Sequence, residues 1–282
     1  MYLGVHVSIS GKIYESIDRA KKLGCTAMQI FSRNPRQWRG LTLDEADARE
    51  FRRRRQASGI KVVAVHVPYL INLATPHDDL YHKSIDAYVQ DMREAAVLGA
   101  EYLVTHMGSY KDSSAEAGLS RFAAAIDMVL QRTRGVAVML LLENTTGAGH
   151  WLGGMFKDHE RVARAVRDRS RVGVCVDTAH LFAAGHDIRE PRVFDAVLDE
   201  VERRCGKKAV RVVHVNDSAG DLGSLVDRHA GIGEGRIGKK AFAHIVNHPR
   251  LRHAAFILET PKPTPREDAK NLRRIRKLIK GS

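Results

Sequence analysis

Eight short apolar segments alternate with amphipathic segments along the chain, and this alternation limits the fold more than any other feature of the sequence. Each apolar segment is a nearly continuous run of β-favouring residues, as expected of strands buried on both faces of a parallel sheet. The predicted strands are residues 2–7, 26–31, 60–66, 101–106, 136–143, 172–177, 210–215 and 255–260. Helical periodicity between them is clearest over residues 42–58, 78–98, 120–134 and 191–205.

Eight strand–helix units in 282 residues predict an α/β protein, and they fit a closed (β/α)8 TIM barrel better than a doubly wound sheet. The chain has no linker, no shift in composition and no low-complexity segment, so we expect residues 1–282 to form a single domain. In such barrels the active site lies at the C-terminal ends of the strands. The residues that end the predicted strands are therefore the first candidates for function.

Six consecutive predicted strands have a residue that can bind a metal ion at their last position or the one before it. These residues are His66, His106, Glu143, Asp177, His214 and Glu259. One such residue is usually structural, but six that converge on one barrel mouth favour a metal cluster. The loops add His180, Asp227 and His229, and two more carboxylates, Asp217 and Asp221, lie in the turn after residues 210–215.

The strand ends and the first three loop candidates supply five imidazoles and four carboxylates. With two to four protein ligands per ion, this set serves about three ions. The nitrogen-rich set favours zinc, with Mn²⁺ or Fe²⁺ able to substitute at some sites, over magnesium or calcium. The three cysteines are widely spaced without a Cys-x-x-Cys pair, which argues against disulfides and against a thiolate zinc site.

The chain carries 46 Lys and Arg against 33 Asp and Glu, a formal net charge of +13. This excess suits a polyanionic partner such as nucleic acid, although a solvated, arginine-rich surface is the plainer explanation. A cluster of close metal ions also stabilises the attacking and leaving oxygens in phosphoryl displacement. Together, charge and ligands favour a phosphodiester substrate.

The sequence shows neither a signal-peptide pattern at its start nor an apolar run near the ~18 residues that a membrane span needs. We therefore expect a cytoplasmic protein without a membrane partner.

The motifs around these residues resemble those of the endonuclease IV family of apurinic/apyrimidinic endonucleases (AP endonuclease family 2), over almost the whole chain. The matching stretches are residues 4–8, 65–74, 142–145, 176–185, 214–238 and 258–261. The resemblance implies a DNA repair enzyme of the deoxyribonuclease IV type that hydrolyses the phosphodiester 5′ to an abasic site in duplex DNA. The products would be a 3′-hydroxyl and a 5′-deoxyribose phosphate, and the enzyme would also remove 3′-blocking groups. Damaged DNA is then the partner in base excision repair, and no obligate protein partner is apparent.

The resemblance also assigns the nine candidate ligands to three Zn²⁺ ions. The sets are His66, His106 and a bridging Glu143; Glu143, Asp177, His214 and Glu259; and His180, Asp227 and His229. Glu143 and Glu259 are the expected catalytic residues. In the family, hydroxide held between the first two zinc ions attacks the phosphate, and the residue matching Glu259 helps to orient it.

Four further residues are expected by resemblance to contact DNA, namely Arg36, Gln37, Tyr69 and Asn72. Arg36 and Tyr69 correspond to side chains that the family inserts through the minor groove while it bends the duplex and flips out the baseless sugar. Extrusion costs least where the base is already missing, so the lesion itself supplies selectivity. We expect His6 to support the metal site from the barrel mouth rather than to bind a metal.

Two other functions stay open. A metal-dependent sugar isomerase or epimerase can share this barrel and a His/carboxylate centre, and a non-catalytic damaged-DNA-binding protein can use an inherited barrel. The candidates Asp227 and His229 for a third ion and the net charge favour the nuclease over the isomerase. The complete ligand set favours an enzyme over a binding protein.

Overall fold

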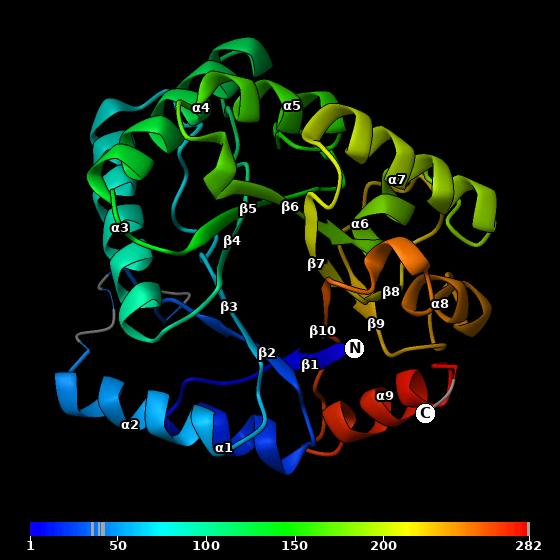
Figure 1. The fold of residues 1–282 in the computed structure, drawn as a ribbon. Coiled ribbons are helices and arrows are strands. Elements are labelled where there is room, and N and C mark those ends of the chain that lie inside the picture. The colour runs from blue at the N-terminus through cyan, green and yellow to red at the C-terminus, as the bar shows by residue number, and fades with distance from the viewer. Residues whose placement is uncertain (35–36, 39, 41–42, 281–282) are drawn as a thin grey trace.

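The computed structural model describes residues 1–34, 37–38, 40 and 43–280. Among these residues, eight parallel strands close into a barrel surrounded by helices (Figure 1), which confirms the predicted fold class. The strands are β1 (Tyr2–His6), β2 (Ala27–Phe31), β3 (Val62–His66), β4 (Tyr102–His106), β5 (Met139–Glu143), β6 (Val172–Asp177), β7 (Val210–His214) and β10 (Ala255–Leu258). Each lies within a predicted strand.

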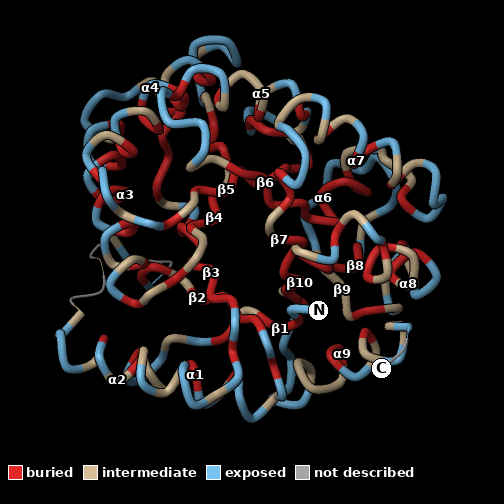
Figure 2. The backbone as a smooth tube through the Cα atoms, viewed as in Figure 1, coloured by how far each residue is buried: buried red, intermediate tan, exposed pale blue. Residues whose placement is uncertain are grey.

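The helices cover the outside of the barrel, where their turns are exposed while the strands are buried (Figure 2). They are α1 (Glu15–Lys22), α2 (Glu45–Gln56), α3 (Asp78–Val97), α4 (Ala115–Arg132), α5 (Phe156–Ala165), α6 (Thr178–Ala183), α7 (Pro191–Cys205), α8 (Lys239–Val246) and α9 (Glu267–Arg276), with 3₁₀ turns η1 (Arg169–Arg171) and η2 (Pro249–Leu251). Helix α4 begins earlier than the predicted residue 120, because the Ser114 hydroxyl accepts a hydrogen bond from the Ala117 N–H at 3.1 Å and caps the helix there.

The barrel closes where β1 pairs with both β10 and β2. The register sets the ends of neighbouring strands beside each other, because His106 lies opposite Glu143 and Asp177 lies opposite His214. The segment between β7 and α8 forms a small antiparallel hairpin of β8 (Asp217–Ser218) and β9 (His229–Ala230). This hairpin brings His229 back toward the barrel mouth.

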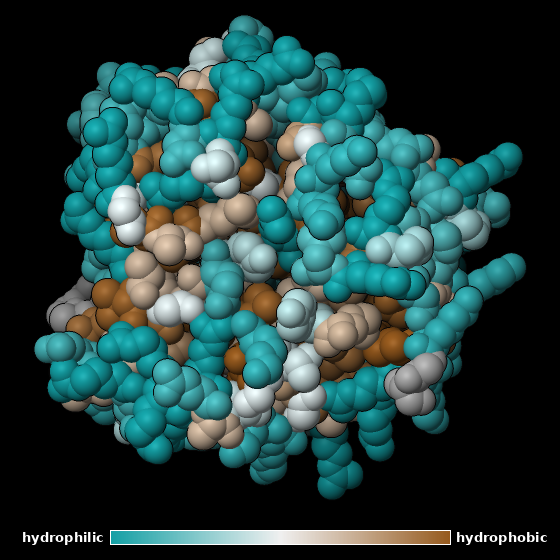
Figure 3. Space-filling model, viewed as in Figure 1, coloured by the Kyte–Doolittle hydropathy of each residue, from teal (hydrophilic) through white to brown (hydrophobic). Residues whose placement is uncertain are grey.

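The hydrophobic core has two parts. A large cluster lies between the strands and the helices, and a smaller one is built from side chains of seven strands, among them Ala27, Val62, Leu141, Val212 and Ile257. Residues from so many strands meet only inside the barrel, so the smaller cluster is its interior. On the face shown in Figure 3, hydrophilic side chains form the rim, and more apolar ones gather toward the centre.

Each helix within the described part of the chain is too short or too polar to cross a lipid bilayer.

Candidate metal centre

The predicted strand-end ligands lie directly above the apolar interior of the barrel. Alternate residues of a strand point to the same side, so the inward row that contains Val62 and Ala64 in β3 continues to His66. The row through Leu141 in β5 continues in the same way to Glu143. The inward residues at the C-terminal ends of β4, β6 and β7 are ligand candidates for the same reason.

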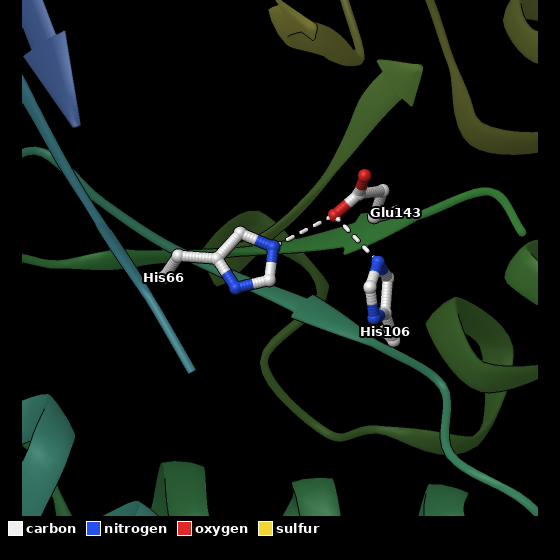
Figure 4. A group of neighbouring side chains, drawn as sticks. All are labelled: His66, His106 and Glu143. Carbon is white, nitrogen blue, oxygen red and sulfur yellow. Dashed lines mark hydrogen bonds and ion pairs between the residues drawn. The ribbon is translucent and has the colours of Figure 1, made fainter. Parts of the chain in front are cut away.

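His66 and His106 approach one carboxylate oxygen of Glu143 from two neighbouring strands (Figure 4). The distances from Glu143 Oε2 are 2.9 Å to His66 Nε2 and 3.3 Å to His106 Nε2. Both His66 and Glu143 are buried. This arrangement is the first predicted ligand set.

The other oxygen of Glu143 faces a different group. Glu143 Oε1 lies 2.9 Å from His214 Nδ1, and the same nitrogen lies 3.2 Å from Glu259 Oε2 and 3.8 Å from Asp177 Oδ2. Glu143 therefore contacts both groups with separate oxygens, which is the geometry that a bridging carboxylate requires.

The third group is assembled from α6 and the β8–β9 hairpin. Asp227 Oδ1 lies 3.2 Å from His180 Nε2 and 3.5 Å from His229 Nε2, and His229 Nε2 lies 3.8 Å from Asp177 Oδ2. Asp177 also caps α6, because its Oδ1 accepts a hydrogen bond from the His180 N–H at 2.8 Å. The Nδ1 atom of His180 lies 2.8 Å from the Asn144 carbonyl oxygen, so its Nε2 is the nitrogen left facing Asp227.

The donor atoms fit divalent cations. At the barrel mouth, three groups without cysteine have ligand atoms within 4.8 Å of one another: His66, His106 and Glu143; Glu143, Asp177, His214 and Glu259; and Asp177, His180 and His229, in which Asp177 takes the place of the predicted Asp227. The buried Nε2 atom of His229 makes no hydrogen bond to any described residue. Such an atom is costly unless a partner satisfies it, and a cation bound by His180, Asp227 and His229 would do so.

The electrostatics of the buried carboxylates point the same way. Burial favours the neutral acid of Glu143, but His214 and His106 outweigh burial and hold the pKa of Glu143 well below its ordinary value. Burial also opposes the charged form of His180, yet Asp177 and Asp227 raise the pKa of His180 to about 10. The carboxylates at the site are therefore ionised and close together. Their negative charge favours the binding of a cation between them.

Cys175 lies close to this centre but is poorly suited to bind a metal. Its sulfur can approach Glu143 and His214, and it belongs to the apolar interior cluster. Burial raises the pKa of Cys175 to about 12, so the thiol keeps its proton near neutral pH.

Two amide side chains outside the predicted ligand set hold the ligands in place. Gln29 Nε2 donates to Glu259 Oε1 at 2.6 Å, and Gln29 Oε1 lies 2.9 Å from His214 Nε2. Asn216 Nδ2 donates to Asp177 Oδ2 at 2.6 Å, and Asn216 Oδ1 accepts from the Glu259 N–H at 2.8 Å. Strand alternation could have predicted Gln29, because it is the next inward residue after Ala27 in β2. Asn216 lies in the turn after β7, and its residue type indicates only a turn and no contact with the ligands.

His6 lies at the edge of the same network. Its Nδ1 atom is 3.3 Å from Glu259 Oε1 and 3.0 Å from Gln29 Nε2. Burial, the largest influence, lowers the pKa of His6 below its ordinary value. Its position matches the supporting role expected for it.

Asp217 and Asp221 were suggested as additional metal ligands, and the structure corrects this. The Asp217 carboxylate accepts backbone N–H groups from Ser218, Gly233, Gly235, Ile237 and Gly238, at distances of 2.8–3.4 Å. Asp221 is exposed and pairs with Arg236 at 3.2 Å. The sequence alone does not distinguish a turn carboxylate that accepts backbone N–H groups from one that binds a metal ion. The contacts in the folded loop do.

The residues expected to contact DNA differ in their surroundings. Tyr69 is exposed and, with Trp151 and Leu225, lines a cavity of about 430 Å³ that reaches His106 and Asp227. Gln37 is exposed, whereas Arg36 lies outside the described residues.

Asn72, also expected to contact DNA, is buried and uses its side-chain amide inside the protein. Its Nδ2 donates to the Ser109 carbonyl at 2.8 Å, and its Oδ1 accepts from Ala74 N at 3.0 Å and Ser109 N at 3.1 Å. It therefore joins the loops after β3 and β4, close to Tyr69.

Comparison with known proteins gives a consistent result. Residues 17–278 match the family described as xylose isomerase-like TIM barrel. A protein of Chloroflexus aggregans named probable endonuclease 4 is 45% identical over 278 residues, which cover 98% of this chain and 97% of the relative. A protein of the same name from Methanoculleus marisnigri is 44% identical over 276 residues, which cover 98% of each chain.

Solved structures extend this comparison. The crystal structure of endonuclease IV from Thermus thermophilus matches with a TM-score of 0.87 and 39% identity over 100% of both chains. A D-tagatose 3-epimerase-like protein matches with a TM-score of 0.77 over 99% of this chain and 97% of its own, but with 15% identity, so it shares the fold alone.

Proposed function

Because the chain belongs to the endonuclease IV family and is an apurinic/apyrimidinic endonuclease, we propose that it is a zinc-dependent enzyme that cuts duplex DNA on the 5′ side of an abasic site. The products would be a 3′-hydroxyl and a 5′-deoxyribose phosphate. One observation carries the proposal: the nine predicted ligands meet at one mouth, with Glu143 facing two groups through its two oxygens. The proposed functional unit is one TIM-barrel domain that spans residues 1–282.

Metal dependence is a property of this family, and the proposed cofactor is three Zn²⁺ ions, with Mn²⁺ or Fe²⁺ able to replace zinc at some sites. The side chains that would hold them are His66, His106, Glu143, Asp177, His180, His214, Asp227, His229 and Glu259. Zinc, when bound, lowers the pKa of water to about 7 and stabilises charge on phosphoryl oxygens.

The protein groups have separate roles in this proposal. Glu143 fixes the spacing of the first two ligand groups, since it contacts His66 and His106 with one oxygen and His214 with the other. Glu259 orients the attacking water. The orientation of Glu259 is held by Gln29, whose Nε2 donates a hydrogen bond to Glu259 Oε1 at 2.6 Å. Asp227 is the most solvent-accessible of the ion-paired carboxylates at the mouth, with a side chain that is 55% exposed, and it lies where the phosphate enters.

Recognition of the lesion would involve the face around Tyr69. Arg36, Gln37 and Tyr69 are the proposed DNA-contacting side chains, and Asn72 supports Tyr69 through the loops that it joins. The cavity beside Tyr69 opens onto His106 and Asp227, so a flipped baseless sugar could place its phosphate at the ligands. A blocked 3′ end presents a similar phosphate without a paired base, so we propose that the enzyme also trims such ends.

The test uses a synthetic duplex with one abasic-site analogue and the zinc-loaded protein. We expect a single cut 5′ to the lesion, with a 3′ end that a DNA polymerase extends. Chelator should stop the cutting, and added zinc should restore it.

An undamaged duplex of the same sequence is the control. Cutting that continues in chelator would contradict the role of the metal. A zinc-loaded protein that leaves the abasic duplex intact would overturn the proposal as a whole.

A further inference from the structure

We propose that Asp195, His244 and His248 form a second metal site, which takes one Zn²⁺ ion on the outside of the barrel between α7 and α8. Asp195 lies near the start of α7, His244 lies in the last turn of α8, and His248 precedes η2. These residues are separate from the ligands at the barrel mouth. The proposal does not depend on the function of that centre.

The three side chains already converge. Asp195 Oδ1 lies 3.0 Å from His244 Nε2 and 3.1 Å from His248 Nε2, and the ligand atoms of all three lie within 4.8 Å of one another. Zinc binds imidazole nitrogen and carboxylate oxygen at about 2.0–2.2 Å, so tetrahedral ligand atoms lie about 3.3 Å apart. The two distances from Asp195 to the histidines are slightly shorter than this, and a small outward movement would accommodate the ion.

The surroundings fix the two imidazoles and leave an entry path. Both rings pack edge-on against the buried Phe194, with ring centroids 6.2 Å from it for His244 and 6.0 Å for His248. The side chain of His248 is 7% exposed, whereas those of His244 and Asp195 are 30% and 46% exposed. An ion could therefore enter from solvent and keep a water molecule on that side.

The local charges do not oppose a cation. Arg250 is the nearby basic residue on η2, and it pairs with Asp199 at 2.7 Å and with Glu202 at 2.8 Å. The Nδ1 atom of His248 accepts the Arg250 N–H at 3.3 Å, which is longer than the usual N–H···O range of about 2.7–3.2 Å. This weak contact can be given up when Nδ1 takes the proton that Nε2 must release to a metal.

Two imidazoles and one carboxylate form a donor set that suits zinc. An ion at this position would join two successive outer helices, and it would stabilise the folded state because the unfolded chain lacks the site.

The experiment compares the zinc-loaded wild-type protein with a His244→Gln/His248→Gln double variant. We expect the variant to hold one zinc ion fewer per chain after equilibration at the same free zinc concentration, measured by elemental analysis. We also expect excess zinc to raise the Tm of the wild type, already loaded at the barrel mouth, by about 5 °C at roughly a hundredfold above Kd. The variant should lack this rise.

Two further variants complete the test. His77→Gln removes an exposed imidazole that lies 3.6 Å from Asp112 in a two-residue pair, and it should keep the wild-type zinc content. Asp195→Asn alters an accessible residue and should lose the ion even if the double variant folds poorly. Incision of an abasic duplex should be unchanged in every variant, which separates this site from the catalytic centre. Equal zinc content and equal Tm shifts in wild type, Asp195→Asn and the double variant would overturn the proposal.

Discussion

At the scale of single residues, the neighbours of each ligand decide which atom it can offer. Gln29 Oε1 accepts a hydrogen bond from His214 Nε2 at 2.9 Å, and the Asn144 carbonyl oxygen accepts one from His180 Nδ1 at 2.8 Å. Each contact leaves the other ring nitrogen facing the carboxylates. Such outer contacts fix the tautomer and the orientation of a ligand, and their loss commonly weakens metal sites.

Replacement of Gln29 by Leu should lower zinc affinity or incision rate by about 10–100-fold, because His214 and Glu259 would both lose a hydrogen-bond partner. Competition with a chromogenic chelator measures the affinity, and the cutting of an abasic duplex measures the rate. Gln90→Leu is the matched control, since Gln90 is exposed and contacts Glu94 at 2.8 Å. Equal effects of the two substitutions would contradict the positioning role of Gln29.

Replacement of Glu259 by Gln should lower kcat for incision by about 10²–10⁴-fold, because the neutral amide cannot accept a proton from the attacking water. The amide keeps the size of the carboxylate, so binding of the abasic duplex should change little. Single-turnover cutting and a gel-shift titration separate the two effects. Cutting at the wild-type rate would remove Glu259 from the proposed mechanism.

At the scale of elements, two buried carboxylates hold loops at the barrel mouth. The Asp217 carboxylate accepts hydrogen bonds from the backbone N–H groups of Ser218 and of residues within 233–238. These bonds connect the two ends of the loop that carries Asp227 and His229. The loop depends on a close approach at Gly235, where an added Cβ would lie 2.4 Å from the Ser218 carbonyl oxygen. Asp91 of α3 similarly holds Arg33, which follows β2.

Asp217→Asn should therefore weaken the third predicted metal group while leaving the first two intact. An amide NH₂ would face backbone N–H donors, so part of the loop would lose its acceptor. We expect zinc bound at the barrel mouth to fall by about one ion per chain and cleavage by protease within residues 218–237 to become faster. Asp221→Asn, in the same loop but exposed, should change neither. Unchanged zinc content in the Asp217 variant would contradict this assignment.

Arg33→Met should lower the free energy of unfolding by about 3–5 kcal/mol, because it leaves the buried Asp91 charge without its partner. Arg33 and Asp91 are both almost fully buried, and Ser32 Oγ also donates to Asp91 at 2.9 Å. Urea denaturation measures the loss. A combined Arg33→Met/Asp91→Leu variant should recover much of it, and a loss of the same size in the combined variant would contradict the explanation by an unpaired charge.

At the scale of the whole molecule, the net charge of +13 is spread over a surface on which many arginines are already paired. On α2, Arg53 and Arg54 contact Glu50 at 2.7 and 2.6 Å, and Arg55 contacts Glu101 at 2.6 Å. These three arginines of the helix are thus already ion-paired. The excess charge still favours association with DNA over long range.

Duplex binding should consequently weaken steeply with salt. If about six to ten phosphates are contacted, affinity should fall by about 10³–10⁵-fold between roughly 50 and 200 mM salt. Fluorescence anisotropy with abasic and undamaged duplexes measures the slope, and the Tm of the free protein in the same buffers controls for unfolding. An affinity independent of salt would argue against a phosphate-dominated interface.

The barrel and the side chains at its mouth could be predicted from local sequence patterns. Strand alternation and the repeated strand–helix unit are local properties, and they place the residue that ends each parallel strand on one rim. This is why His66, His106 and Glu143 could be predicted to meet before any distance was known.

The contacts that each of these groups makes depend on the folded chain. Asp217 and Asp227 belong to one loop, yet backbone amides surround the first and imidazoles surround the second. Gln29 takes its role from contacts with residues 185 and 230 positions away, and Asp195 meets His244 across 49 positions. Closure of the barrel and packing of its helices create such contacts, and no local periodicity encodes them.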